Sequence, residues 1–172
     1  MYNSIIKIMG FKIMEKIVSI AGYMLTQALD SINRTKILNP FLIALKENNE
    51  EFKFIPKGLS LEQTIPKTVD MFEENEQNAK SAAIVYPAEL ENIDGSRDSV
   101  IIAMAQDYIN QEYIIISQPY KFTNNCLKVS KFELLEYSPF IVEKLDKLEE
   151  CFAKGALSYD DAKHIWSERF RE

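Results

Sequence analysis

The residues that could carry nucleophilic chemistry are few in this chain, which has one histidine, His164, and two cysteines, Cys126 and Cys151. A cysteine–histidine pair is catalytic only when the two side chains lie within hydrogen-bond reach and a third group orients the base. His164 is predicted on a helix near Cys151, but the sequence shows no orienting partner and no recognisable nucleophile turn. We therefore interpret His164 as a surface residue and both cysteines as free thiols.

Metal and phosphate sites are equally poorly represented. Asp94, Asp98 and Asp107 flank one predicted strand, but they lack the Asp-x-Asp-x-Asp-Gly spacing of a calcium loop. The cysteines lack the CxxC or Cys/His spacing that is typical of zinc. The five glycines form no GxGxxG or GxxxxGK[ST] loop, and no GxSxG nucleophile elbow occurs. We expect no catalytic residues, no metal and no cofactor.

Aromatic side chains in the central part of the chain are the remaining candidates for binding. These rings are Tyr108, Tyr113, Tyr120, Phe122 and Tyr137. Exposed on one face of a sheet, they could bind a peptide or a base, whereas packing in the core is the alternative for most of them. For a site on the sheet face, the candidate ligand-binding residues are Arg97, Asp98 and Tyr120.

The composition is that of one globular domain. The chain has 172 residues, of which 47% are hydrophobic and 27% are charged, and a chain of this length needs no metal or disulfide to fold. The formal net charge is −6, and the acidic excess falls in short runs at 47–51 and 73–76. No dense Lys/Arg cluster would neutralise phosphates, so we expect no nucleic-acid binding. A negative surface would instead attract a basic protein.

The N-terminal region gives no sign of membrane insertion or export. Residues 17–29 are rather apolar, but polar residues interrupt them, and the stretch is too short and too polar to span a bilayer. Read from Met14, the stretch could be a weak signal peptide, but its charged start is poor and no A-x-A cleavage site follows. Together with unpaired cysteines, these features predict a cytoplasmic protein without a membrane anchor. The native start stays open, because Met1, Met9 and Met14 could each begin the chain.

Hydrophobic periodicity in the first half predicts helices around a β-hairpin. Apolar residues at helical spacing indicate an amphipathic helix over about 11–32. Two short apolar runs at 41–45 and 52–55, around an Asn-rich break, predict the hairpin. A second helix is predicted over 59–78, with its regular part beginning near Ile65, because Pro66 fits only the first turn.

The middle of the chain is the clearest β region. Strands are predicted over 82–90, 99–108, 112–120 and 127–137. The apolar phase switches within the last strand, which a β-bulge near Ser130 or Lys131 would explain. The second and third strands carry consecutive isoleucines, which is typical of central strands covered on both faces. We therefore expect burial of Ile102, Met104, Ile114 and Ile116.

The last third is predicted to be helical again. Residues 140–154 carry an apolar stripe that stops at Gly155, and Ser158 is predicted to cap a second helix. We divide the chain into an α+β body over 1–137 and a C-terminal helical hairpin over 138–172. The fold class is α+β, with an antiparallel sheet of about five to six strands and N-terminal, middle and C-terminal helices, in the order α-β-β-α-β-β-β-β-α-α.

Residues 39–137 resemble small, uncharacterised bacterial proteins of α+β type. The likeness lies in Asn39-Pro40-Phe41 opening the hairpin, Asp94-Gly95 followed by Asp98, and Gln118-Pro119-Tyr120 closing a strand. This resemblance implies a fold and no activity.

Residues 141–170 resemble the short C-terminal helical hairpins called SHOCT domains. The likeness lies in Leu145-Asp146-Lys147-Leu148, Lys154-Gly155-Ala156-Leu157-Ser158 and Asp160-Asp161-Ala162. His164-Ile165-Trp166 replaces the Lys-rich end of the family pattern. The resemblance implies an element for oligomerisation or docking.

Size and charge favour a non-catalytic interaction or regulatory protein, such as one that neutralises a partner as immunity proteins do. The partner would be another protein or a second copy, with residues 140–170 as the dimer surface and Trp166 and Phe170 as partner-binding candidates. The alternative is an enzyme or small-ligand binder with its site on the sheet face. A deep polar pocket near Arg97 would favour the alternative, whereas an exposed apolar patch on a flat or convex surface would favour the interaction protein.

Overall fold

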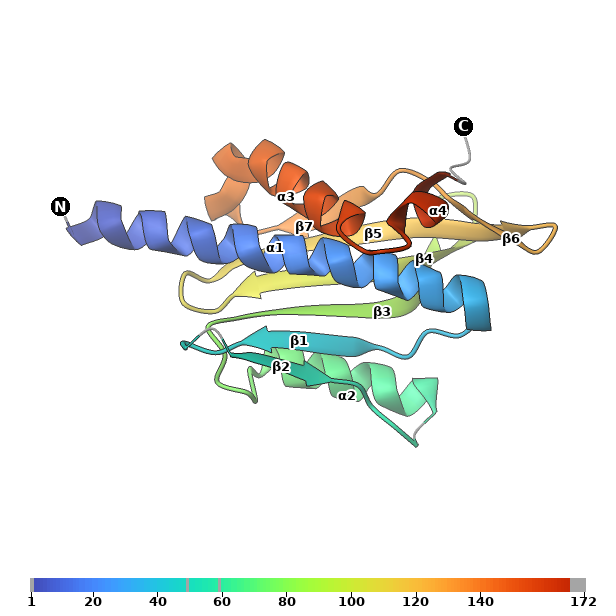
Figure 1. Cartoon of the computed structure of the whole chain (residues 1–172), viewed down its shortest axis with the longest axis horizontal. Coiled ribbons are helices and arrows are strands. Elements are labelled where there is room, and N and C mark those ends of the chain that lie inside the picture. Colours follow the sequence, from blue (N-terminus) through green and yellow to red (C-terminus); the bar gives the residue numbers. More distant parts are fainter. Residues whose placement is uncertain (1, 49, 59, 168–172) are drawn as a thin grey trace.

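One antiparallel sheet with helices packed against it forms the fold, which confirms the predicted α+β class (Figure 1). The computed structural model describes residues 2–48, 50–58 and 60–167. The sheet has seven strands in the order β2-β1-β3-β4-β5-β6, and β7 pairs with β5 beside β6. The elements are α1 (Tyr2–Thr35), β1 (Phe41–Leu45), β2 (Glu51–Phe54), α2 (Leu61–Glu73), β3 (Ser81–Glu91), β4 (Arg97–Asp107), β5 (Glu112–Thr123), β6 (Cys126–Val129), β7 (Glu133–Tyr137), the 3₁₀ helix η1 (Pro139–Lys144), α3 (Leu145–Leu157) and α4 (Ala162–Ser167).

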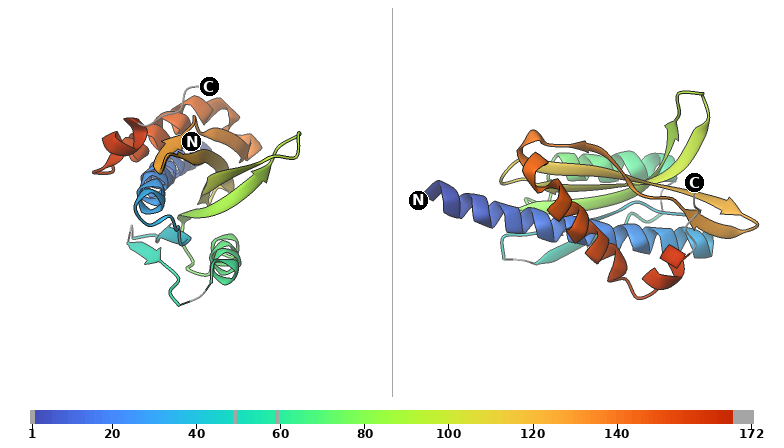
Figure 2. Two further views of the ribbon diagram at one scale, coloured as in Figure 1. Left: turned by 90° about the vertical axis from the view of Figure 1, so that its right-hand side faces the viewer. Right: turned by 90° about the horizontal axis from the view of Figure 1, so that it is seen from above.

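Helix α1 is longer than the predicted helix over 11–32. Its 34 residues correspond to about 51 Å, and its N-terminal turns extend past the sheet (Figure 2). A stripe at helical spacing is buried against the sheet and α3: Met14, Ile17, Val18, Ala21, Met24, Leu25, Ala28, Leu29 and Ile32. In the described part of the chain, no helix combines the length and apolar character that crossing a bilayer requires.

The two faces of the sheet have separate hydrophobic cores, because alternate strand residues point to opposite sides. The larger core lies under α1 and includes Ile101, Ile114 and Ile116. The smaller core lies under α2, which packs on β1 and β3 around Phe72. The predicted burial is confirmed for Ile102, Ile114 and Ile116, whereas Met104 is only partly buried.

Helix α2 begins within the predicted range 59–78, but its regular part begins earlier than predicted. Ser60 is the residue before its first turn, and the backbone N–H of Ser60 donates to Oε1 of Gln63 at 3.4 Å. The expectation that the regular part begins near Ile65 is therefore wrong, because Pro66 lies inside the helix. Pro66 and Glu62 are both exposed, so the Glu62 carbonyl that Pro66 cannot bond has access to water.

The strand predicted over 127–137 is divided into β6 and β7. Both pair with β5, and the registers on either side of the break set residues 130–132 opposite only residues 118 and 119. One extra residue therefore lies at the position where the bulge near Ser130 or Lys131 was predicted. A second register shift follows in β7, opposite residues 115 and 116 of β5.

The C-terminal helices differ from the prediction at Gly155 and Ser158. Helix α3 continues through Gly155 to Leu157 and does not stop there. The Ser158 hydroxyl donates to the Gly155 carbonyl at 2.7 Å, so Ser158 closes the end of α3 and does not cap α4. Phe170 lies outside the described residues.

Gly155 belongs inside α3 because α3 crosses α1 with the two backbones in contact. A Cβ atom on Gly155 would lie 1.8 Å from the Ser19 carbonyl oxygen of α1. In the reverse direction, a Cβ atom on Gly22 of α1 would lie 2.1 Å from the Phe152 carbonyl oxygen. Both α3 and α4 contact α1, so the predicted hairpin packs on the body of its own chain. Self-association through residues 140–170 stays a prediction.

We expect Gly155→Ala to lower the free energy of unfolding by at least about 2 kcal/mol. Alanine would favour an exposed helix by about 1 kcal/mol, but here its Cβ meets backbone atoms, and overpacking costs about 1–3 kcal/mol or more. Urea unfolding followed by the emission of Trp166, the single tryptophan, measures the change. The control Lys154→Ala, at an exposed neighbouring position, should change stability by less than about 0.5 kcal/mol. Equal stability of Gly155→Ala and the parent would contradict the close crossing.

Candidate functional site

A single hydroxyl group joins the three helices α1, α3 and α4. The buried Thr26 Oγ1 of α1 donates to the Ala156 carbonyl of α3 at 2.9 Å. The same oxygen accepts a hydrogen bond from Nε1 of Trp166 in α4 at 3.2 Å. Trp166 also packs against the larger core. This predicted partner-binding residue therefore contacts its own chain.

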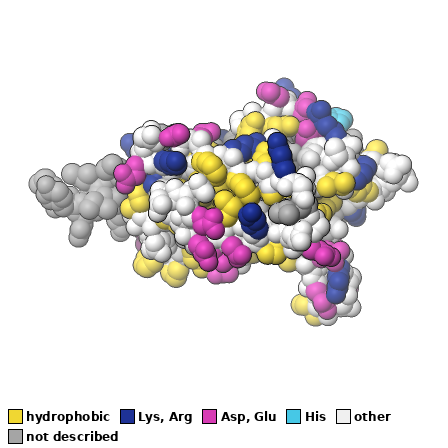
Figure 3. All heavy atoms as spheres, turned by 90° about the horizontal axis from the view of Figure 1, so that it is seen from below, with side chains coloured by type: hydrophobic (Ala, Val, Ile, Leu, Met, Phe, Trp, Pro, Cys, Tyr) yellow, Lys and Arg dark blue, Asp and Glu magenta, His cyan; other side chains and the backbone are white. Residues whose placement is uncertain are grey.

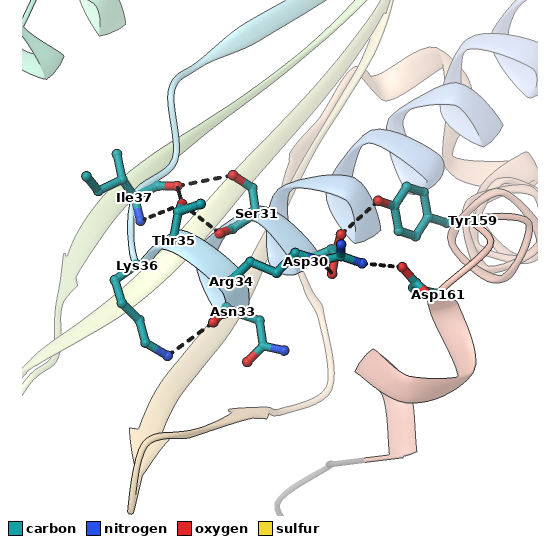
Figure 4. Close-up of polar contacts among 9 residues, drawn as sticks. All are labelled: Asp30, Ser31, Asn33, Arg34, Thr35, Lys36, Ile37, Tyr159 and Asp161. Atoms are coloured by element: carbon teal, nitrogen blue, oxygen red, sulfur yellow. Dashed lines mark hydrogen bonds and ion pairs between the residues drawn. The ribbon is translucent and has the colours of Figure 1, made fainter.

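A charged network ties the α3–α4 loop to the C-terminal end of α1 (Figure 4). Arg34 Nε donates to Asp30 Oδ1 at 2.8 Å, and Arg34 Nη2 pairs with Asp161 Oδ2. The Tyr159 hydroxyl donates to the second oxygen of Asp30 at 2.9 Å. Because the Asp30 side chain is only 10% exposed, both donors compensate the burial of its charge.

The network changes the acid–base behaviour of its members. Burial and the hydrogen bond to Asp30 raise the pKa of Tyr159 to about 12. The hydrogen bond to Asp30 also raises the pKa of Arg34. The rings of Tyr23 and Tyr159 pack edge to face, with their centroids 5.5 Å apart. These contacts hold the loop before α4 on α1 and thereby set the position of α4.

A small recess lies beside this network, between α1, the β5–β6 turn and α4. Its volume is about 150 Å³, and it is lined by Asn33, Asn125, Cys126, Leu127, His164 and Ile165. The histidine was predicted near Cys151, but the structure brings it to the same recess as Cys126. Among the described residues, no group of three or more His, Cys, Asp or Glu could hold a metal ion.

The second cysteine, Cys151, lies elsewhere, on α3 against the larger core. Burial, with the nearby Glu15 carboxylate as a smaller cause, raises the pKa of its thiol. A raised pKa disfavours the thiolate, which is the reactive form.

Arg97, Asp98 and Tyr120, the predicted ligand-binding residues, do not all lie on the same face of the sheet. Arg97 and Asp98 are adjacent on β4, so their side chains point to opposite faces of the sheet. Arg97 Nη1 lies 3.5 Å from Glu89 Oε2, and Asn92 Nδ2 donates to Asp98 Oδ2 at 3.0 Å. These pairs lie on the β3–β4 hairpin, which projects from the body (Figures 2 and 3).

Tyr120 is only partly exposed and packs against the larger core. Burial raises the pKa of its hydroxyl, the Glu89 carboxylate adds to the rise, and a hydrogen bond with Ser99 opposes it. Its ring also meets Phe122 edge to face, with centroids 6.4 Å apart. Much of the Tyr120 ring is therefore packed against the core, which is the alternative that the sequence left open.

An exposed acidic and apolar surface lies where β7 leads into η1, and the sequence predicted only parts of it: Tyr137 as a binding candidate and residues 140–143 within the dimer surface. Residues 133–143, which we name the β7–η1 surface, contain three glutamates and no Lys, Arg or His. Four large apolar side chains in this short stretch are exposed: Leu135 (44%), Tyr137 (36%), Phe140 (71%) and Val142 (53%). The available signal was the combination of three carboxylates with an apolar run that fits neither a helical nor a strand period.

Comparison with known proteins found no relative of this chain. The chain matches no family model, no curated protein and no solved structure. The likenesses to small bacterial α+β proteins and to SHOCT hairpins therefore stay predictions.

We expect Tyr159→Phe to lower the free energy of unfolding by about 1–2 kcal/mol near neutral pH, because the variant loses a hydrogen bond to a charged, largely buried carboxylate. Tyr23→Phe is the control, since the structure gives the Tyr23 hydroxyl no hydrogen bond to another described residue, and it should cost less than about 0.5 kcal/mol. Urea unfolding followed by Trp166 emission measures both.

The pH dependence of this difference follows from the raised pKa of Tyr159. The unfolded phenol ionises near 10, whereas the folded one ionises at about 12. The stabilisation is therefore complete below pH 10 and is lost as the pH rises from about 10 to 12. A difference between parent and Tyr159→Phe that stays constant across that window would contradict the hydrogen bond.

Proposed function

We propose that this protein is a non-catalytic interaction protein that binds a basic protein partner through the β7–η1 surface. The observation that carries the proposal is the exposure of four large apolar side chains within residues 135–142. Exposed apolar patches with a polar rim mark protein-binding sites, and these four side chains are exposed within eight consecutive residues. Aromatic anchors such as Phe140 and Tyr137 supply most of the binding energy in such sites.

The charge of the surface supports a basic partner. Glu133, Glu136 and Glu143 are exposed, and the whole chain has a formal net charge of −6. Complementary charge accelerates encounter with a positive partner and disfavours acidic ones. An acidic protein that covers and neutralises a basic partner, as immunity proteins do, is the specific form of this proposal.

The cytoplasm is the compartment that we propose for this interaction. Its reducing conditions keep an exposed thiol such as that of Cys126 free. The proposal involves neither nucleic acid nor a membrane surface, because the binding surface is acidic. Self-association through residues 140–170 is the alternative use of the same region.

A small-ligand binder, with or without enzymatic activity, is the second candidate function. The recess that Cys126 and His164 line together is the observation that favours it. Pockets for drug-sized ligands usually measure about 300–1,000 Å³, so a recess of about 150 Å³ fits only a very small molecule. The exposed apolar side chains of the β7–η1 surface therefore support the interaction protein better.

A charge-reversal experiment tests the proposal. Partners are captured by cross-linking in a lysate of the source cells. We expect the double variant Glu133→Lys/Glu143→Lys to capture at least about tenfold less of the basic partner than the parent does, because charge attraction becomes repulsion. The control Glu74→Lys/Glu76→Lys, at exposed positions after α2, changes the net charge equally, from −6 to −2, and should keep the capture. Equal capture by both variants, or equal loss, would show that the β7–η1 surface is not the binding site.

A further inference from the structure

Strand β7 is an edge of the sheet whose outer side no other described strand covers. It pairs with β5 alone, and four of its five residues are exposed. The outer side of an edge strand presents backbone N–H and C=O groups that can pair with another chain. The unpaired edge, residues 133–137, is therefore part of the β7–η1 surface.

The opposite edge of the sheet, β2, is built differently. It carries the exposed Lys53 in its middle, while Phe52 and Phe54 turn inward to the core under α2. A lysine on an edge strand is a common protection against pairing with another chain, as is a proline. Strand β7 has neither residue, and the one irregularity in its pairing with β5 is the register shift at the exposed Leu135.

We propose that β7 binds an extended segment of the partner as an added β-strand, with Lys or Arg alternating with apolar residues in that segment. This inference rests on the proposed function and specifies its geometry. Strand addition supplies backbone hydrogen bonds along β7, and side chains give the selectivity. Basic residues of the added strand pair with Glu133 and Glu136, and its apolar residues contact Leu135 and Tyr137.

Charge favours a basic partner segment over a second copy of this chain as the strand that pairs with β7. Pairing of β7 with the β7 of a second copy would bring a second set of its two glutamates, Glu133 and Glu136, to the edge. Like charges across neighbouring strands are destabilising, whereas opposite charges contribute about 0.2–1 kcal/mol per pair. The five residues of β7 span about 17 Å, so a segment of about five residues covers the edge.

Synthetic peptides test the pairing. The probe is the capped peptide Lys-Val-Lys-Val-Lys-Val-Lys, and its controls are a Glu-for-Lys analogue and an analogue with every peptide nitrogen methylated. We expect the probe to shift the amide NMR signals of residues 133–137 and to slow their hydrogen exchange. The methylated analogue should bind at least about tenfold more weakly, because it donates no backbone hydrogen bonds. The acidic analogue should not bind.

Two matched variants locate the binding edge. Leu135→Lys places a lysine on β7, as Lys53 does on β2, and we expect this variant not to bind the probe peptide. Ile55→Lys, which follows β2 at nearly the same exposure (45% against 44%), should bind as the parent does. Circular dichroism checks that both variants fold. If Leu135→Lys does not fold, Glu133→Lys/Glu143→Lys with the same probe replaces it.

The outcomes separate this inference from the proposed function. Equal binding of the methylated analogue, or slowed exchange at 51–54 in place of 133–137, would overturn strand addition. Concentration-dependent shifts at 133–137 without any peptide would show pairing with a second copy and would also overturn it. None of these results affects the capture experiment, whose failure alone would overturn binding of a basic partner at this surface.

Discussion

The contact between the backbones of α1 and α3 at Gly22 and Gly155 is the constraint on which the rest of the structure depends. Each glycine lies where the Cβ atom of any other residue would fall 1.8–2.1 Å from a carbonyl oxygen of the opposite helix. The close approach brings the Thr26 hydroxyl to the end of α3 and to Trp166. The C-terminal helices thereby complete the hydrophobic layer that α1 begins over the sheet.

The same crossing determines what stays exposed. The chain passes from the β7 edge to α3, which packs on α1, through the six residues of η1, and these residues are buried on one side only. Ile141 is buried, and Lys144 Nζ donates to the mostly buried Glu112 Oε1 at 3.1 Å, which fastens η1 to the start of β5. Phe140 and Val142 consequently face away from the body beside the unpaired edge.

Local sequence patterns predict the strands and the helices well, because alternation and helical spacing report burial directly. They fail where a distant contact overrides a local preference. A glycine commonly ends a helix, but Gly155 allows α3 to cross α1 closely, and α3 continues to Leu157. The shared recess of Cys126 and His164 depends on that continuation, so sequence spacing could not find it. Arg97 and Asp98, in contrast, could have been separated by strand alternation alone.

The two edges of the sheet differ in the charged side chains that they present. An unprotected apolar edge would aggregate with other edges unless something discriminates among them. The glutamates of β7 provide that discrimination, because they oppose pairing with a second acidic copy while leaving the backbone groups accessible. Strand β2 differs because it exposes a lysine, Lys53, in addition to Glu51. In the proposed strand addition, a basic extended segment would therefore meet only negative charge on β7, whereas on β2 it would also meet Lys53.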